Sequence, residues 1–467
     1  MYFHSLTFAV FLFLTYSAYW RLERKGQNLL LLVASYVFYG FWDYRFLVLI
    51  ALSTIADYAF ALQMPAAKTP AVRKRWLVLS LSMNLGLLFV FKYFDFFSRS
   101  FALLIEALGF RADPFTLDVI LPVGISFYTF QTLSYTIDCY RGRFTPSRDP
   151  IAFAAFVTFF PQLVAGPIER ATHLLPQFLT DRQFSAARAA DGCRQILYGL
   201  LIKLVVADNL ATVADKVYRS SASPSALDWV IGTYAFAFQI YCDFAGYSSV
   251  AIGTARLFGF DLSQNFRTPY FSASLREFWS RWHISLSTWF RDYVYIPLGG
   301  NQLGAARHRI NLMITFVMSG LWHGATFTFV AWGFFHGLLL VVESFFRREA
   351  PSTGGSRLLR TLFTFNLVCV GWVFFRSMDV SQAFQALDTI FTEGDWRLRV
   401  LGARTVLFHG ALVLALVGIE WAQREHPHGF WMDRLPKPAR WAIYYSAAIA
   451  MAAVGRIEEV PFIYFQF

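Results

Sequence analysis

The sequence predicts an all-α polytopic membrane protein, and three observations lead to this fold class. Hydrophobic residues make up 56% of the 467 residues, charged residues make up only 15%, and apolar runs recur from one end of the chain to the other. A soluble domain carries about 25% charged residues, which cover its surface, so this chain has too few charges for a surface in water. The clearest apolar runs are Phe8–Tyr19, Leu29–Trp42, Phe46–Leu62, Trp76–Phe91, Ile310–Leu321 and Phe327–Val342.

The apolar runs predict roughly ten to twelve membrane helices. A span needs about 20 mostly apolar residues, and several runs are shorter, so we expect tilted, broken or re-entrant helices enclosed by their neighbours. The start of the chain, Met1–Trp20, has no basic segment before its apolar run and no small-residue cleavage site after it. It is therefore interpreted as a membrane helix and not as a signal peptide. We expect residues 1–467 to form a single integral membrane domain, because no internal repeat or long linker is evident.

The formal net charge of +11 is interpreted as a signal of membrane topology, so no nucleic-acid partner is expected. Basic residues gather in short loops between the apolar runs, and the positive-inside rule places such loops on the cytoplasmic side. One apolar helix, Trp441–Val454, follows the last basic loop, so we expect the C-terminus to lie outside. The basic loops are Arg21–Lys25, Lys68–Arg75, Arg141–Arg148, Arg347–Arg360 and Arg424–Arg440.

Polar side chains are concentrated in the middle of the chain, from about residue 207 to residue 337. Charge that faces lipid is expensive, so polar residues in a membrane protein favour an enclosed cavity. The clearest example is Ser274–Leu298, where charged residues and tryptophans share one segment. Either Ser272 or Ser274 is suited to cap its start, and Pro297 ends it, so we expect one interfacial or protein-enclosed helix.

His283 lies within this segment, and a histidine at membrane depth predicts a functional site when it faces protein or a wet cavity. On a continuous helix, Trp279, Ser280 and Ser287 would lie beside it at three- and four-residue spacings. The serines would leave room for a channel and supply hydrogen bonds. The alternative interpretation is an amphipathic surface helix whose histidine lies at the level of the lipid headgroups.

His323 ends the apolar run Ile310–Gly324. Gly320 and Gly324 on either side allow another backbone or a thin substrate to approach closely. An imidazole with a pKa near 6.5 is suited to act as a general base toward a hydroxyl or thiol nucleophile. His336 follows thirteen residues later and is expected on the same face of the core. The alternative for both is a structural histidine bonded to a carbonyl of a neighbouring helix, and the pattern favours this alternative for His336.

The sequence predicts no metal site, no disulfide framework and no phosphate-binding loop. The four cysteines, Cys139, Cys193, Cys242 and Cys369, are widely spaced and form no CxxC pair. No histidine pair has the short spacing of a helical metal site, and neither a glycine-rich phosphate loop nor GxSxG occurs. ATP hydrolysis and α/β-hydrolase chemistry therefore have no support in the sequence.

Long motifs follow one another between about residue 29 and residue 376 and resume in the last seven residues. They are LLLLVASYVFYGFW (29–42), LPVGISFYTFQTLSYTIDCYRG (121–142), FPQLVAGPIER (160–170), YCDFAGYSSVAIG (241–253), NFRTPYFSASLREFWSRWHISLSTWFRDYVYIPLGGN (265–301), SGLWHGATFTFVAWGFFHG (319–337), GWVFFR (371–376) and PFIYFQF (461–467). Together they resemble the membrane-bound O-acyltransferase (MBOAT) family, in the bacterial branch of the alginate and peptidoglycan O-acetyltransferase membrane subunits, which is related to the teichoic-acid D-alanyl transferase. Asp379–Glu459 matches this family only loosely.

The resemblance implies a ring of membrane helices that is thinned at its centre, with a tunnel linking the two faces. It implies that His323, in the WHG motif, is the catalytic histidine, and that His283, in the RWHIS motif, is a second functional histidine. His336 falls on the related WGxxHG motif, whose role is less settled.

The resemblance also implies a thioester donor, expected to be acetyl-CoA, that enters from the cytoplasmic side, with no permanently bound cofactor. His323 would act as a general base toward the acceptor hydroxyl or would accept the acyl group itself. His283 would orient or polarise the donor carbonyl, or would hold a partner of His323.

Further residues in the middle of the chain, from about residue 207 to residue 337, are candidates for lining the donor tunnel. Arg276, Arg281 and Arg291 suit the donor's phosphates, because arginine binds phosphate through two hydrogen bonds, and snorkelling at the interface is their alternative role. Asp243 and Tyr247 are candidates for lining the tunnel.

We therefore expect a multi-pass protein of a bacterial inner membrane that passes an acetyl group across the membrane to an exported polysaccharide such as alginate, cellulose or peptidoglycan. No segment resembles a soluble SGNH-type esterase, so a periplasmic SGNH-type acetyltransferase partner and polysaccharide export machinery are expected. One alternative is D-alanyl-type transfer from a carrier protein to a cell-envelope polymer. Another is a transporter or export-complex scaffold, since polar residues also mark substrate pathways.

Overall fold

The computed structural model describes residues 1–163, 166–346, 354–426, 428, 430, 432 and 435–456. Helices make up its regular structure, and no strand occurs within these ranges. The predicted all-α polytopic class is confirmed. The motif PFIYFQF and part of the basic loop 347–360 lie outside the described residues.

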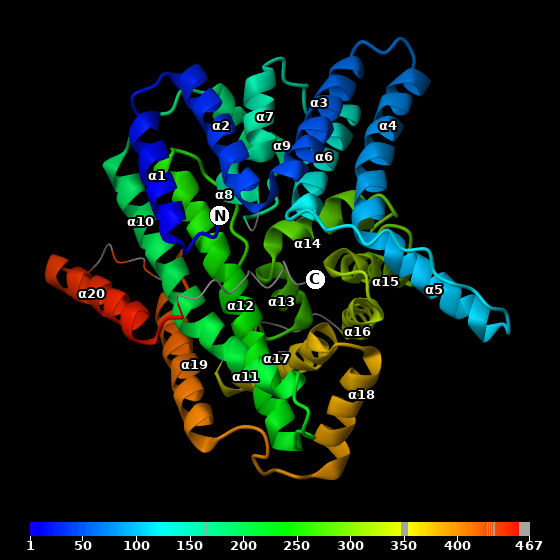
Figure 1. Ribbon diagram of the computed structural model, residues 1–467, viewed down its shortest axis with the longest axis vertical. Helices are drawn as coiled ribbons and strands as arrows, with labels where there is room; N and C mark the ends of the chain where they lie inside the picture. Colours follow the sequence, from blue (N-terminus) through cyan, green and yellow to red (C-terminus); the bar gives the residue numbers. More distant parts are fainter. Residues whose placement is uncertain are drawn as a thin grey trace. The chain divides into compact units, whose positions relative to one another are not determined.

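The chain divides into two compact units (Figure 1). Unit 1 comprises residues 1–192 and 254–263, and unit 2 comprises residues 193–253 and 264–467. Helices α10 (Ala186–Leu201) and α12 (Ala226–Leu257) contribute residues to both. The single integral domain stays a prediction.

The remaining helices follow in chain order. Unit 1 contains α1 (Leu6–Tyr19), α2 (Arg24–Asp43), η1 (Tyr44–Phe46), α3 (Leu47–Gln63), α4 (Pro70–Leu88), η2 (Phe89–Tyr93), α5 (Phe94–Ala107), α6 (Ile125–Tyr140), α7 (Pro150–Thr158), α8 (Phe160–Leu163) and α9 (Ala171–Leu179). Unit 2 contains η3 (Ile202–Ala207), α11 (Asp208–Tyr218), η4 (Pro269–Phe271), α13 (Leu275–Arg281), α14 (Ile284–Phe290), η5 (Arg291–Tyr295), α15 (Ala305–His323), α16 (Phe327–Glu343), α17 (Gly355–Arg376), α18 (Val380–Asp388), η6 (Thr389–Glu393), α19 (Ala403–Gln423) and α20 (Lys437–Val454).

Five helical segments among the described residues are long and apolar enough to cross a membrane. They are Arg24–Gln63, Pro70–Ala107, Ala186–Tyr218, Gly355–Arg376 and Ala403–Gln423. This is fewer than the roughly ten to twelve membrane helices that the sequence predicts. Three of the five segments each join two α-helices, through η1, η2 or η3, and other apolar helices, such as α16, are shorter than a full span. The ring with a thinned centre and a tunnel stays a prediction.

In unit 1, α3, α4 and α6 pack on one another around a buried polar network. The carboxylate of Asp57, which is fully buried, accepts hydrogen bonds from Ser80 Oγ at 2.6 Å and from Asn84 Nδ2 at 2.8 Å. Thr132 on α6 donates to Asn84 Oδ1 at 3.2 Å. Polar groups in an apolar interior need internal partners, so this network ties the three helices together.

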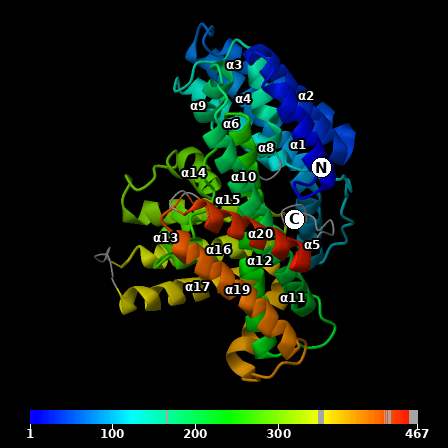
Figure 2. The ribbon, with the colours of Figure 1, turned by 90° about the vertical axis from the view of Figure 1, so that its left-hand side faces the viewer.

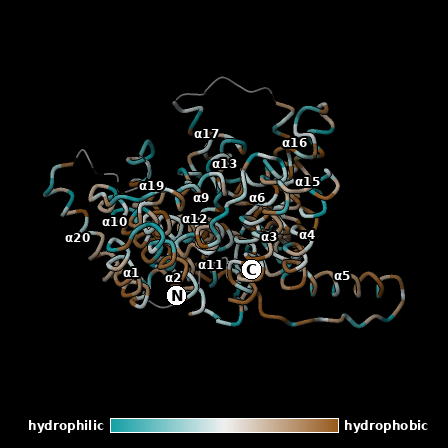
Figure 3. The backbone as a smooth tube through the Cα atoms, turned by 90° about the horizontal axis from the view of Figure 1, so that it is seen from above, coloured by the Kyte–Doolittle hydropathy of each residue, from teal (hydrophilic) through white to brown (hydrophobic). Residues whose placement is uncertain are grey.

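The apolar side chains of α5 point outward from unit 1, and its hydrophobic colouring is evident in Figure 3. Phe97, Phe101 and Leu104 are all exposed. An apolar surface of this kind is suited to contact lipid, because lipid imposes no penalty on apolar groups.

In unit 2, α15 and α16 are in backbone contact through glycines. A Cβ atom at Gly320 would overlap the carbonyl oxygen of Phe329, and one at Gly333 would overlap that of Phe316. Only glycine permits so close an approach. Helix α17 packs against α16, as Figure 2 shows, and this arrangement encloses the two histidines of α15 and α16.

Candidate active site

His323 is the last residue of α15 and is buried, with 4% of its surface exposed. Gly324 leaves the helical conformation and ends α15. The imidazole contacts aromatic rings edge to face, with centroid distances of 4.9 Å to Trp322, 4.9 Å to Trp332 and 5.4 Å to Phe375. These rings exclude bulk water, so the imidazole is held in an environment where electrostatic interactions are strong.

Trp332 lies between His323 and His336 and brings the two histidines to one side of unit 2. Its ring centroid lies 4.9 Å from that of His323 and 5.0 Å from that of His336. His336 is fully buried, and neither of its ring nitrogens has a hydrogen-bond partner among the described residues. A Cβ atom at Gly371 would lie 2.5 Å from Nε2 of His336, so α17 covers this imidazole. The alternative interpretation of His336 was a structural histidine bonded to a carbonyl of a neighbouring helix. No such carbonyl partner occurs among the described residues.

The single helix predicted over Ser274–Leu298 is wrong, because the structure interrupts it at His283. Helix α13 begins at the N-cap Ser274, whose side chain accepts a hydrogen bond from the backbone of Glu277, and it ends at Arg281. His283 then adopts a left-handed backbone, with φ of 42° and ψ of 54°, before α14 begins. Such a conformation costs a residue other than glycine about 1–3 kcal/mol, and it persists only where surrounding contacts enforce it.

The imidazole of His283 is 1% exposed and packs between two aromatic rings. The ring of Phe244 lies 4.5 Å away and that of Trp322 lies 6.0 Å away, measured between centroids. Trp322 also contacts His323, so this one indole links the two histidines of the site. His283 lies outside the candidate membrane spans, and burial lowers its pKa to about 3, which keeps the imidazole neutral.

The three arginines that the sequence offers for donor phosphates are all engaged with carboxylates. Arg276 lies 3.8 Å from Glu343, Arg281 lies 2.7 Å from Glu277, and Arg291 lies 2.8 Å from its neighbour Asp292. Their side chains are 50%, 28% and 58% exposed. The described contacts of these arginines are thus on a solvated surface and not with the three histidines.

Asp243 and Tyr247 lie on α12 beside a buried lysine. Lys203 Nζ lies 2.6 Å from Asp243 Oδ1 and 2.7 Å from Asp208 Oδ1, and it lies over the ring of Tyr247 at 5.5 Å. All three charged side chains are less than 5% exposed. Lys203 belongs to the π-helix η3, a type of distortion that is frequent at functional sites. The sequence reasoning singled out Asp243 but missed Lys203, which lies in an apolar run.

A cavity of about 440 Å³ opens within unit 2 and was not predicted. Tyr241 donates a short hydrogen bond to the buried carboxylate of Glu420, and both line the cavity. Arg267 and Arg424 are also among the lining residues. Phe266 forms another part of the wall, and its ring also contacts that of His283 at 6.4 Å. The cavity is therefore lined by both polar and apolar residues, and one of its walls adjoins the site.

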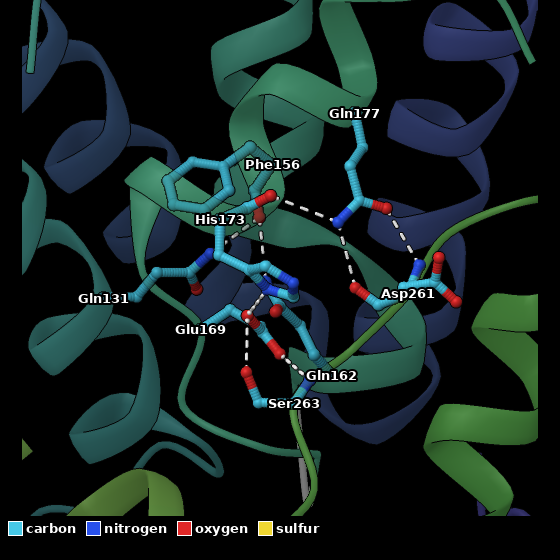
Figure 4. Close-up of polar contacts among 8 residues, drawn as sticks. All are labelled: Gln131, Phe156, Gln162, Glu169, His173, Gln177, Asp261 and Ser263. Carbon is cyan, nitrogen blue, oxygen red and sulfur yellow. Dashed lines mark hydrogen bonds and ion pairs between the residues drawn. The ribbon is translucent and has the colours of Figure 1, made fainter. Parts of the chain in front are cut away.

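A second polar cluster, in unit 1, was also missed (Figure 4). Glu169, from the motif FPQLVAGPIER, is fully buried and lies 2.7 Å from Nδ1 of His173. The backbone N–H and the hydroxyl of Ser263 both donate to this carboxylate. Gln177 exchanges two hydrogen bonds with the backbone of Asp261. The cluster joins α9 to residues 261–263, and the only sequence signal for it was an acidic residue within an apolar motif.

Known sequences resemble this chain along most of its length. The sequence model of the membrane-bound O-acyltransferase family matches residues 31–378. The probable alginate O-acetylase AlgI of Pseudomonas putida is 43% identical over 389 residues, covering 82% of this chain and 78% of that protein. The peptidoglycan O-acetyltransferase of Helicobacter pylori is 34% identical over 410 residues, covering 81% and 77%. The teichoic acid D-alanyltransferase of Bacillus subtilis is 27% identical over 274 residues, covering 54% and 68%.

Proposed function

This chain belongs to the membrane-bound O-acyltransferase family and is a multi-pass membrane O-acyltransferase, and from that premise we propose its substrates and mechanism. The acyl group is acetyl, taken from a cytoplasmic thioester and passed across the bacterial inner membrane for O-acetylation of an exported polysaccharide. The relatives named as alginate O-acetylase and peptidoglycan O-acetyltransferase support this choice, because they are more similar to the chain than the D-alanyltransferase is.

The observation that carries the proposal is the position of His323 at the end of α15, buried among aromatic rings. In the proposed reaction His323 accepts the proton of the acceptor hydroxyl as that oxygen attacks the thioester carbon. The carbon–sulfur bond breaks as the carbon–oxygen ester bond forms, and the thiolate takes up the proton. Transfer of the acyl group to His323 first, and then to the hydroxyl, uses the same geometry.

His283 is proposed to act on the donor carbonyl. A neutral imidazole donates a hydrogen bond through one ring nitrogen, and such a donor stabilises the negative charge that develops on the carbonyl oxygen. The low pKa of His283 supports this role over that of a base, because a nitrogen with a pKa of about 3 binds protons weakly at neutral pH. His336, beyond Trp332, is proposed to line the donor tunnel near His323.

The donor's phosphates are proposed to bind arginines of unit 2. Arg276, Arg281 and Arg291 are partly exposed, and a phosphate would exchange with the carboxylate that each now contacts. Arg267 and Arg424 offer a second position, because they line the cavity whose wall contacts His283. Asp243 and Tyr247 remain proposed tunnel-lining residues.

The acceptor hydroxyl is proposed to belong to a periplasmic SGNH-type acetyltransferase partner, which delivers the acetyl group to the polymer alongside the export machinery. The donor is acetyl-CoA, and a thioester on a carrier protein is the alternative. Purified chain in lipid nanodiscs would be given radiolabelled acetyl-CoA or an acetylated carrier protein in parallel. Release of free thiol from acetyl-CoA supports the proposal, and release from the carrier alone would overturn the choice of donor.

His323→Ala tests the enzymatic role in cells, scored as acetyl groups on the exported polymer. We expect acetylation to fall by about 10²–10⁴-fold, because the substitution removes the general base. His409→Ala is the matched control, since His409 bonds a carbonyl within α19, away from the site. Full acetylation by His323→Ala at normal membrane abundance would end the proposal.

A further inference from the structure

Two segments of unit 2 that are far apart in the sequence pair with each other around His283. The backbone N–H of Arg267 donates to the carbonyl of Arg281 at 3.0 Å, and that of Ile284 donates to the carbonyl of Asn265 at 2.9 Å. These two bonds lie on either side of residues 282 and 283. The chain is thus fixed immediately before and immediately after the left-handed residue.

Asn265 adds side-chain bonds to this pairing. Its Oδ1 accepts from the hydroxyl of Ser285 at 2.7 Å and from the backbone N–H of Ser285 at 3.3 Å. Its Nδ2 donates to Ser248 Oγ on α12 at 3.1 Å. Asn265 is 1% exposed, so these bonds form away from bulk water. A single amide therefore ties the start of α14 to α12.

The same helix α12 supplies the ring against which His283 packs. Phe244 lies one helical turn before Ser248, and its ring is 4.5 Å from the imidazole. The backbone next to His283 and the ring that packs against its imidazole are therefore both held by the same helix, α12. Asn265 joins them, because its side chain bonds both Ser248 and Ser285.

We propose that Asn265 is a positioning residue, which holds His283 in its left-handed conformation and aims its imidazole at the donor carbonyl. The inference rests on the proposed role of His283. An amide suits the position because it accepts two bonds through oxygen and donates one through nitrogen. A left-handed backbone at a residue other than glycine persists only where contacts with neighbouring residues hold it in place. The hydrogen bonds of Asn265 are such contacts.

Asn265→Ala tests the proposal in purified protein, with thiol release from whichever thioester the wild type consumes. We expect kcat to fall by about 10- to 100-fold, because a displacement of about 1 Å in a reacting group has this effect. KM should change by less than about threefold, since the role concerns the transition state and not general binding. Ser285→Ala, which leaves the backbone bond to Oδ1, should show a smaller fall in kcat.

Asn209→Ala is the matched control. Asn209 is a buried asparagine of α11 in the same unit, with hydrogen bonds to the carbonyls of Val205 and Val454, and it has no proposed role in catalysis. We expect it to lower the thermal stability as Asn265→Ala does while leaving kcat unchanged. Equal losses of kcat in the two variants would show a general structural effect and overturn the proposal.

A double-variant cycle gives the second readout. His283→Asn removes the imidazole but tolerates the left-handed backbone, as asparagine does more readily than most residues. Once it is present, adding Asn265→Ala should lower kcat no further, because the group that Asn265 positions is gone. If the losses of kcat in the two single variants instead multiply in the double variant, the proposal is overturned.

If His283→Asn abolishes the rate entirely, the double variant cannot be compared. The proposal is then judged by whether Asn265→Ala lowers kcat while leaving KM nearly unchanged. A fully active His283→Asn would instead refute the proposed function of His283.

Discussion

Two regions of the molecule, one around the exposed His173 and one around the buried His336, differ in how their histidines are partnered. In unit 1, His173 forms a hydrogen bond with the carboxylate of Glu169, which also accepts a hydrogen bond from the backbone N–H of Ser263. In unit 2, His336 is surrounded by aromatic rings, and its ring nitrogens have no hydrogen-bond partner among the described residues. Buried polar groups usually have hydrogen-bond partners, so the two imidazoles differ in what their replacement should cost in stability.

The electrostatic consequence also differs. The hydrogen bond with Glu169 raises the pKa of His173, whereas burial lowers that of His283. A carboxylate partner favours the charged imidazolium, and burial favours the neutral ring. His173 therefore keeps its proton to a higher pH than a free histidine does, and His283 stays neutral.

The largest effect is expected at the glycine contact that holds the histidine region together. Gly320→Ala places a Cβ atom into the carbonyl of Phe329, and overpacking of this kind costs about 1–3 kcal/mol of unfolding free energy. Acyl transfer should be lost with it, because α15 carries His323. Gly86→Ala in α4 is the control, since no atom lies within 4 Å of its added Cβ, and it should be neutral or slightly stabilising. If Gly320→Ala and Gly86→Ala change the Tm equally, the prediction that the glycine contact between α15 and α16 is specifically required is wrong.

A smaller effect, of opposite sign in the two regions, is expected when each histidine is replaced by leucine. His336→Leu breaks no hydrogen bond to a described residue, so the Tm should be unchanged or higher, while acyl transfer falls by about 10- to 100-fold. His173→Leu deprives Glu169 of a partner and should lower the unfolding free energy by about 1 kcal/mol, with acyl transfer per folded molecule retained. A stability loss at His336 larger than that at His173 would contradict the comparison.

The smallest effect is a pH dependence in unit 1. Because the folded pKa of His173 is raised, its interaction with Glu169 contributes fully below the ordinary value near 6.5 and is lost as the pH rises through the raised value. The difference in Tm between wild type and His173→Gln should therefore shrink as the pH rises above about 6.5. A difference that grows with pH would show that the neutral imidazole is the stabilising form.

Local sequence signals predicted part of the site. The structure confirms Ser274, one of the two N-cap candidates, as the start of α13, and it buries His323 at the end of the apolar run in which the sequence places it. The fold class followed from composition, because few charges leave no soluble alternative.

The remaining features depend on pairs that are distant in sequence. The break at His283 arises from hydrogen bonds to residues 265 and 267, and nothing within Ser274–Leu298 except the final proline signals an interruption. Glu169 lies 94 positions from its partner Ser263, and Tyr241 lies 179 positions from Glu420. Local patterns carry no information on such pairs, so the sequence alone could not predict these two sites.

Lys203 and Asp208, which lie within a candidate membrane span, and Asp243 on α12 form a buried cluster of one amine and two carboxyl groups. The lysine is shared, so replacing Lys203 leaves two buried carboxylates without their cation, whereas replacing one aspartate leaves an ion pair in place. A buried charge without a partner is far more costly than an apolar group of similar size. Protein engineers who wish to replace Lys203 will therefore need to redesign both aspartates with it.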